Sequence, residues 1–392
     1  MKFGIITDNK GSIEQIDVDL TLSAEAKAHG AKHPLAYLDS KVMVNSDMPS
    51  PRQQIYAQLG LNRKDIKLKE AMDGTGGIKS GLTGPTIAES NSVTGRLAAS
   101  SYLFDMLENS LRSNDYGILG IFNSKAAAVD SIANTKFDRP IINMSRPAEG
   151  RSRAISQLSM PARMLTLTVS DISMRISGSS LGLEYSDQAA ESVSLPIVAM
   201  SLARQAEEEA MERVEGFLLG FLNGDVDMGM AALATVPGAV KKAKDLDATV
   251  VAAGTLSQKA WVNYLFEGSR YRQIDTIVTD LAGALAIEQR VGRPTVQSDD
   301  STSKRIDVPY AIINPTWPNE VKVIVTQDPA WPANTIMGFD SKYGYHVVNS
   351  TTLGYEGLET FALRRSTALR FDQGSIAYRL YDSAFSVLTL TL

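Results

Sequence analysis

The sequence of 392 residues predicts an α+β fold from three features. A long amphipathic helix is predicted over residues 195–222, alternating residues typical of β-strands occur on both sides of it, and residues 274–292 combine a buried strand with a short helix. The length suggests two or three domains, each of which can be assembled from segments that are distant in the sequence.

The N-terminal region is expected to be an extended arm. Pro34, Pro49 and Pro51 interrupt residues 1–60 and leave room for only short elements. Residues 73–85, with the sequence DGTGGIKSGLTGP, are rich in glycine and have little to bury, so they predict a flexible loop.

A helix is expected after this loop. Asn91 or Ser92 can cap it, and Asn114 should end it. Its apolar face is formed at approximately helical spacing by Val93, Leu97, Tyr102, Phe104, Leu107 and Leu111.

Residues 137–180 predict a long two-stranded excursion. The run MLTLTVSDISMRI alternates along a strand, so Leu165, Leu167 and Val169 share one face. A hairpin that projects from a body cannot bury both faces within its own fold, and it is marginally stable alone. It therefore needs a neighbour, unless it is an internal sheet hairpin, which is the alternative.

The clearest element is the helix over residues 195–222, which would be roughly 40 Å long at 1.5 Å per residue. Ser194 can cap it, and Pro196 is tolerated in its first turn. Glu209 and Arg213 are spaced i,i+4 in the favourable order on its polar face. Its apolar positions are Leu195, Val198, Leu202, Ala206, Ala210, Val214, Phe217 or Leu218, and Phe221.

The second half of the chain predicts a further helix and an α/β unit. Ser257 caps the helix and Gly268 ends it, with Ala260, Tyr264 and Leu265 on the buried side. Residues 274–278 predict a buried strand that runs into a short helix, which stops before Pro294. From residue 306 onward we expect strands and turns, including a turn at FDQGS and a closing strand in AFSVLTLTL.

Composition excludes several classes of function. The net charge of −5 lacks the positive field of a protein that grips phosphates, so specific DNA binding is not expected. The absence of cysteine excludes disulfides, thiolate metal sites and a cysteine nucleophile. No apolar run reaches the roughly 18 residues of a membrane span, and the N-terminus lacks a signal-peptide core.

The strongest catalytic motif is G-x-S-x-G at residues 178–182, centred on Ser180. A nucleophile elbow needs a helix directly behind the serine, but LEYSDQAAESVS follows, so the next long helix begins too late. His346 is the only downstream base. A glycine-rich strand end is the preferred interpretation, and a serine hydrolase is the alternative.

Three other motifs each fail on a specific requirement. Ile78 interrupts the phosphate-loop pattern in GTGGIKS. His29 and His33 have no glutamate between them and are expected to be a solvated pair. Asp225 and Asp227 begin a calcium-like loop that ends on a valine, so a helix-terminating turn is expected. The sequence therefore predicts no catalytic, cofactor-binding or metal-ligating residues, and no cofactor.

The order of these elements over residues 137–392 resembles the major capsid proteins of tailed bacteriophages, whose fold is shared with encapsulins. Residues 181–225 are similar to the family's long spine helix with its glycine turn, and residues 257–296 to its helix, strand and short helix closed by a glycine-arginine pair. Residues 332–345 are similar to the loop that returns from the axial domain. Single residues that match the family near the C-terminus are Arg370, Asp372, Gly374, Ala384 and Phe385.

The resemblance implies a specific arrangement of domains. Residues 1–135 would form an N-terminal arm and extension, and residues 136–182 a projecting hairpin loop. Residues 183–224 and 337–392, with part of 240–270, would form a peripheral domain with the spine helix. Residues 225–336 would form an α/β axial domain near a five-fold or six-fold axis.

The resemblance also suggests contacts between subunits. Some relatives weld the shell through a lysine in the projecting loop, but no lysine occurs between Lys136 and Lys241, so we expect non-covalent contacts. Arginines of the loop can pair with acidic residues of a neighbour's helix, although they can equally be solvated. The candidate residues are Arg146, Arg151, Arg153, Arg163, Glu207, Glu208 and Glu209.

The function implied by the resemblance is that of a major capsid protein, not an enzyme. Its copies would form the hexamers and pentamers of an icosahedral shell around double-stranded DNA, without sequence-specific binding. It would be found in the virion after assembly in the host bacterial cytoplasm, with no membrane partner. No scaffold segment is expected to have been removed from its N-terminus, so separate scaffolding, portal and cement proteins are the implied partners. The alternatives are an encapsulin-like compartment shell and a serine hydrolase using Ser180 and His346.

Overall fold

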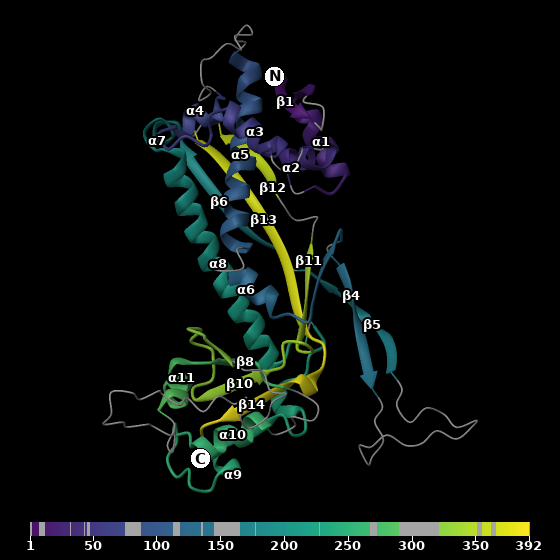
Figure 1. Cartoon of the computed structure of the whole chain (residues 1–392), viewed down its shortest axis with the longest axis vertical. Helices are drawn as coiled ribbons and strands as arrows, with labels where there is room; N and C mark the ends of the chain where they lie inside the picture. The colour runs from purple at the N-terminus through teal and green to yellow at the C-terminus, as the bar shows by residue number, and fades with distance from the viewer. Residues whose placement is uncertain are drawn as a thin grey trace, which may run out of the picture.

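The computed structural model describes residues 2–7, 12–31, 33–42, 44, 48–74, 88–112, 118–134, 136–144, 165–176, 178–226, 228–266, 273–289, 321–350, 355–361 and 366–391. This part of the chain is a mixed α+β structure in which the long helix α8 (Leu195–Asn223) runs between two ends (Figure 1). The first four helices lie at one end, and the C-terminus lies at the other. We call these ends the head and the lower sheet, and the strands between them the middle sheet.

Helix α8 confirms the predicted strut. Pro196 lies in its first turn, and Ser194 occupies the N-cap position, although its side chain makes no capping hydrogen bond. Gly224 ends the helix with φ of 81°, where a Cβ would lie 2.6 Å from the Ala232 nitrogen, so only glycine fits there. The expected ion pair forms, with Arg213 Nη2 3.0 Å from Glu209 Oε1. Every apolar position predicted to face the core is buried, with Leu218 rather than Phe217 at the ambiguous position.

The head corrects the prediction of an extended arm over residues 1–60. Leu35, Leu38 and Ile55 are completely buried in one core with residues of α5 and α8. Pro34 and Pro51 lie in the first turns of helices, where the missing N–H of proline costs nothing, so these prolines start helices instead of preventing them. The elements of the head are β1 (Lys2–Thr7), β2 (Ser12–Asp17), α1 (Leu20–Ala28), α2 (Pro34–Lys41), α3 (Pro51–Gln58), α4 (Leu68–Met72), α5 (Ala88–Arg112) and α7 (Asp187–Ser192).

The helix predicted after the glycine-rich loop is α5, which packs against α8. It begins at Ala88, so Asn91 and Ser92 lie inside its first two turns and do not cap it. Most of the glycine-rich segment lies outside the described residues.

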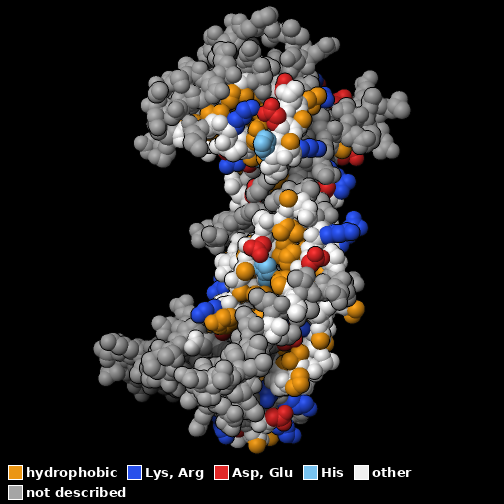
Figure 2. Space-filling model, turned by 90° about the vertical axis from the view of Figure 1, so that its right-hand side faces the viewer, with side chains coloured by type: hydrophobic (Ala, Val, Ile, Leu, Met, Phe, Trp, Pro, Cys, Tyr) orange, Lys and Arg blue, Asp and Glu red, His pale blue; other side chains and the backbone are white. Residues whose placement is uncertain are grey.

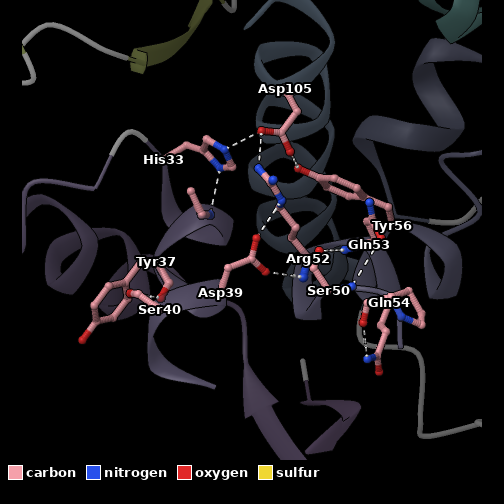
Figure 3. Close-up of polar contacts among 12 residues, drawn as sticks. His33, Tyr37, Asp39, Ser40, Ser50, Arg52, Gln53, Gln54, Tyr56 and Asp105 are labelled. Atoms are coloured by element: carbon pink, nitrogen blue, oxygen red, sulfur yellow. Dashed lines mark hydrogen bonds and ion pairs between the residues drawn. The ribbon is translucent and has the colours of Figure 1, made fainter. Parts of the chain in front are cut away.

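A buried polar cluster ties the head helices α2 and α3 to α5 (Figure 3). His33 Nε2 and Arg52 Nη1 lie 2.8 and 2.9 Å from Asp105 Oδ1, and the Tyr56 hydroxyl donates to Oδ2 at 2.6 Å. Asp39 holds the other side of Arg52 at 2.7 Å. The prediction of a solvated histidine pair is therefore wrong for His33, which is 2% exposed and also accepts from the Ala36 N–H through Nδ1.

The environment sets the ionisation of this cluster. Burial alone would raise the pKa of Asp105, but the hydrogen bonds from His33 and Tyr56 and the charge of Arg52 together lower it below its usual value. Burial raises the pKa of Asp39, because the charge of Arg52 only partly compensates. Burial, and then the adjacent Asp105 carboxylate, raise the pKa of Tyr56.

The middle sheet is organised around one long strand, β13, which joins the head to the lower part of the molecule (Figure 1). Residues 366–374 pair with β6, and residues 375–379 pair with β11. The turn predicted at FDQGS is therefore wrong, because this segment has ladder partners, and its first residue, Phe371, and the following Ile376 are buried. The strands and the adjoining helix are β3 (Ala128–Ile132), β6 (Gly178–Ser186), β11 (Tyr345–Ser350), β12 (Tyr355–Phe361), β13 (Ser366–Arg379) and α6 (Ile118–Ser124).

The lower sheet confirms the predicted α/β unit. Strands β8 and β9 are parallel and are connected through α11, and the Asp280 side chain caps this helix by accepting from the Gly283 N–H at 2.9 Å. Ser257 caps α10 by accepting from the Ala260 N–H at 3.0 Å, as predicted. The sheet order is β7 (Val240–Lys242), β14 (Phe385–Thr389), β10 (Thr335–Phe339), β8 (Thr276–Thr279) and β9 (Lys322–Val325). The adjoining helices are α9 (Ala243–Leu246), α10 (Gln258–Phe266) and α11 (Leu281–Glu288).

The C-terminal strand β14, predicted within AFSVLTLTL, forms and pairs with β10 and β7. The domain boundary expected between residues 336 and 337 falls inside β10. Strand β14 therefore belongs to the same sheet as β8 and β9, which lie in the segment expected to be axial. No helix in the described part of the chain is long and apolar enough to cross a membrane.

Candidate assembly surface

Two strands leave the body of the molecule and form a sheet of their own (Figure 1). Strand β4 (Lys136–Met144) and strand β5 (Leu165–Arg175) pair antiparallel, from Lys136 opposite Arg175 to Met144 opposite Leu165. We call this pair the ribbon. The two strands pair as the prediction of a two-stranded excursion requires, and they join no larger sheet in the described part of the chain. Residues 145–164, between the strands, lie outside the described residues.

We call the part of the ribbon before its register shift, residues 136–138 and 173–175, the root. The root is anchored by apolar contacts with the middle sheet. The ring of Phe137 lies 6.2 Å from the ring of His346 and 5.8 Å from that of Tyr378. On the other strand, Met174 is 4% exposed and Ile176, directly after it, is 2% exposed. These contacts fix where the ribbon begins.

Arg139 adds a polar anchor at the same root. Its guanidinium donates to the carbonyl oxygens of Met228, Gly229 and Arg379 at 2.8, 2.9 and 3.0 Å, and it lies 5.2 Å from the centre of the Tyr378 ring. Burial lowers the pKa of Arg139, and the nearby Asp382 carboxylate opposes this shift.

Beyond the root the ribbon has no sheet partner among the described strands. The strand register shifts between Asp138 and Pro140, at a position where a strand tolerates proline. Thr166 and Thr168 on β5 are exposed, and Ile142 on β4 is half-buried. Two strands alone are marginally stable, and unpaired strand edges are templates for further pairing. The ribbon is therefore a surface that another chain can complete.

The structure places three of the seven predicted contact residues. Glu207 and Glu208 are exposed on α8, and Glu208 lies 3.2 Å from Arg204 in an exposed ion pair. Glu209 is half-buried and is held by Arg213, so it is the least accessible of the three. The other four, Arg146, Arg151, Arg153 and Arg163, lie outside the described residues.

The geometry overturns the alternative of a serine hydrolase. Ser180 lies inside β6 opposite Asp372, and not on a sharp turn or at a strand end. His346 lies on β11 opposite Tyr378. These two partners are six positions apart on β13, which separates Ser180 from His346 by about 20 Å. A nucleophile and its base must lie within hydrogen-bond reach, so this pair cannot act together.

His346 has structural contacts instead. Its Nδ1 lies 2.6 Å from the Tyr378 hydroxyl, and its Nε2 lies 2.8 Å from Asp130 Oδ2, at ion-pair distance but without the alignment of a hydrogen bond. The ring is 6% exposed. No group of three or more histidine, aspartate or glutamate residues suited to a metal ion occurs in the described ranges.

Sequence analysis missed Arg139 as a functional candidate. Its carbonyl partners lie 89 to 240 positions further along the chain. Nothing in the local sequence distinguishes it from the other arginines of the segment. Only the neighbouring Pro140, which marks a strand irregularity, gave a local signal.

The face of the molecule from which the ribbon leaves is shown in Figure 2. Among the described side chains on this face, lysine and arginine are interspersed with aspartate and glutamate and do not form one large basic patch. This pattern does not favour a surface that grips nucleic acid through phosphates.

Comparison with known proteins gives structural matches only. No protein-family model and no curated protein sequence matches the chain. The capsid of an empty GTA particle is 16% identical, with a TM-score of 0.44 over 69% of this chain and 90% of that chain. The capsid of Myoviridae phage XM1 is 13% identical, with a TM-score of 0.39 over 68% and 90%. A virus-like particle from Pyrococcus furiosus is 11% identical, with a TM-score of 0.40 over 74% and 98%.

Proposed function

We propose that this chain is a major capsid protein, whose copies assemble into an icosahedral shell that encloses double-stranded DNA. The observation that carries the proposal is the ribbon, a pair of strands that leaves the body without another sheet partner in the described chain. In a monomer such a surface invites aggregation, whereas in a closed lattice a neighbour covers it.

The rest of the architecture supports a subunit that touches several neighbours. Helix α8 spans the distance between the head and the lower sheet, and the ribbon leaves between these ends (Figure 1). Contacts at separate points of one subunit can each be modest, because their simultaneous engagement adds avidity. The sequence predicts no catalytic or metal-binding groups, and a shell protein does not require them.

The proposed contacts between copies are polar and non-covalent. Arginines 146, 151, 153 and 163 of one copy would approach Glu207 and Glu208 of the next. Charge-assisted hydrogen bonds between guanidinium and carboxylate groups are directional, so they favour one docking register. Glu209 would contribute less, because Arg213 already occupies it.

The proposal extends to the surroundings of the subunit. Hexamers and pentamers would form around the lower sheet, and the packaged DNA would lie beside the shell without specific contacts, as the net charge of −5 favours. Assembly would take place in a bacterial cytoplasm with separate scaffolding, portal and cement proteins.

Negative-stain microscopy of the protein expressed alone tests this function, together with light scattering on the same sample. Closed particles of uniform size are expected. A compact monomer at high concentration would refute the proposal. The contents of particles formed during infection decide between a capsid and a compartment shell, because DNA supports the first and a cargo enzyme the second.

A further inference from the structure

We infer that Arg139 sets the direction in which the ribbon leaves the body, by joining the ribbon to the turn that ends α8. The geometric role of Arg139 does not depend on the proposed function, and only an effect of Arg139 on shell assembly rests on it. One guanidinium on β4 donates to Met228 O and Gly229 O in this turn, at 2.8 and 2.9 Å, and to Arg379 O on β13, at 3.0 Å. Three segments that are distant in the sequence therefore meet at one side chain.

Two backbone hydrogen bonds close this turn. The N–H of Asp225 donates to Met230 O at 2.9 Å, and the N–H of Met230 donates back to Asp225 O at 2.8 Å. Gly224 and Gly229 have positive φ angles of 81° and 59°. The turn connects α8 to the chain that enters the lower sheet, so its position is linked to that of the lower sheet.

A second arginine holds the same turn from the side of the body. The fully buried Arg379 donates to Phe221 O at 3.1 Å and to Ala231 O, and it lies 3.2 Å from Asp382. Its contacts hold the two ends of the turn, whereas Arg139 holds the middle. Arg379 secures the turn to the body, and Arg139 secures the ribbon to the turn.

The position of Arg139 along the ribbon explains why it affects direction and not attachment. It lies at the register shift between Asp138 and Pro140, where the anchored root ends. Phe137 and Met174 hold the root through apolar contacts, and Phe137 shares the Tyr378 ring with Arg139. Apolar contacts are non-directional, whereas hydrogen bonds from a planar guanidinium constrain an angle.

A lysine should not replace this arginine. The ammonium group is a compact charge on a flexible stem, and it lacks the fixed fork that reaches carbonyls on two elements at once. Arg139→Lys is therefore expected to behave like Arg139→Gln.

Distance measurement on the unassembled subunit tests the inference. The chain contains no cysteine, so Thr168→Cys on the ribbon and Val251→Cys in the lower part, both exposed, accept a pair of spin labels without further changes. We expect a narrow distance distribution in this background, and a distribution about twice as wide after Arg139→Gln or Arg139→Lys. Arg175→Gln is the matched control, because Arg175 is exposed on the other strand of the root. It should leave the width unchanged.

Hydrogen exchange provides a second measurement. The amides of Gly229 and Met230 should exchange about tenfold faster in Arg139→Gln than in the parent protein, because the turn loses its outer support. The amides in the middle of α8 should keep their protection.

The outcomes separate this inference from the proposed function. Equal distance distributions in the Arg139 and Arg175 variants would overturn the role of Arg139. General loss of protection, including α8, in both Arg139→Gln and Arg139→Lys would also overturn it, because Arg139 would then serve folding. A parent protein that forms no shells would contradict the proposed function and leave the distance result intact.

Discussion

The head and the ribbon differ in how far their described side chains are buried. In the head, Leu35, Leu38 and Ile55 are completely buried against helices of the same chain. Along the ribbon, Thr166 and Thr168 are exposed and Ile142 is half-buried. The head core is thus completed within one subunit, whereas the ribbon beyond its root pairs with no further strand in the described part of the chain.

This difference assigns separate tasks to the two regions. A segment with its own core contributes to the stability of the subunit, and its loss unfolds the surrounding structure. A projecting strand pair contributes little to subunit stability, but it offers backbone and side-chain groups to a neighbour. Changes in the head should therefore alter unfolding, and changes in the ribbon should alter assembly.

The largest effect on the free energy of unfolding is expected for Leu38→Asp. An uncompensated charge would enter the head core, at a cost of more than about 3 kcal/mol. Thr168→Asp on the exposed ribbon is the control and should change stability by less than about 0.5 kcal/mol. Urea unfolding followed by circular dichroism measures both. Equal stability of the two variants would show that the head is not part of the folded body.

A smaller loss of about 3 kcal/mol at pH 7 is expected for Asp105→Asn, because the buried His33 and Tyr56 and the half-buried Arg52 lose a charged acceptor. The pKa of Asp105 is lower in the folded than in the unfolded state. Its stabilising effect is therefore present above pH about 4, the usual aspartate pKa, and disappears as the pH falls through the folded value.

The pH dependence of the difference between the two proteins isolates this carboxylate. The raised pKa of Asp39 acts with the opposite sign. Burial, its main cause, is present in both proteins, whereas the charge of Asp105, a smaller cause, is lost in the variant. Chemical unfolding of both between pH 7 and pH 3 should show a difference that shrinks on acidification. A difference that stays constant over this range would contradict the proposed ionisation of Asp105.

Deletion of residues 146–160 should have little effect on subunit stability and a complete effect on assembly. The segment lies between the two strands of the ribbon, beyond the anchored root. The midpoint of thermal unfolding should change by no more than about 1 °C, which corresponds to less than about 1 kcal/mol for a chain of this length. Electron microscopy should show no closed particles. Normal shells from this deletion would remove the ribbon from the assembly proposal.

The smallest effect on stability is expected for the double variant Glu207→Gln and Glu208→Gln. Both side chains are exposed, and exposed ion pairs contribute less than about 1 kcal/mol. If these residues contact arginines of a neighbour, the yield of particles at low salt should fall, and the difference from the parent should diminish at high salt. Sedimentation across a salt series measures this. Unchanged yields at every salt concentration would exclude the proposed pairing.

Elements with a strong periodic pattern were predictable from the sequence. The apolar spacing of α8, the strand and helix around Asp280, and the alternation along β5 all appear in the structure at the expected residues. For α8 the burial of side chains follows directly from helical periodicity. The ribbon as a candidate surface was predictable for the same reason.

Predictions were wrong where a local sequence signal is compatible with two different structures. Pro34 and Pro51 suggested interruption of structure, but proline is equally compatible with the first turn of a helix. The turn predicted at FDQGS became part of β13, because β6 and β11 supply ladder partners along it. Local preference is a weak signal, and tertiary contacts override it.

The sequence by itself determined the periodic elements of this protein, the order in which they follow one another, and the exclusion of cysteine chemistry. Only the tertiary structure decided that the described helices of residues 20–58 pack with α5 and α8, that Ser180 and His346 lie far apart, and that Arg139 meets the turn after α8. The physical reason is the separation along the chain over which each effect acts. Periodicity acts over neighbouring residues, whereas these contacts join positions that are distant in the chain and depend on which surfaces pack together.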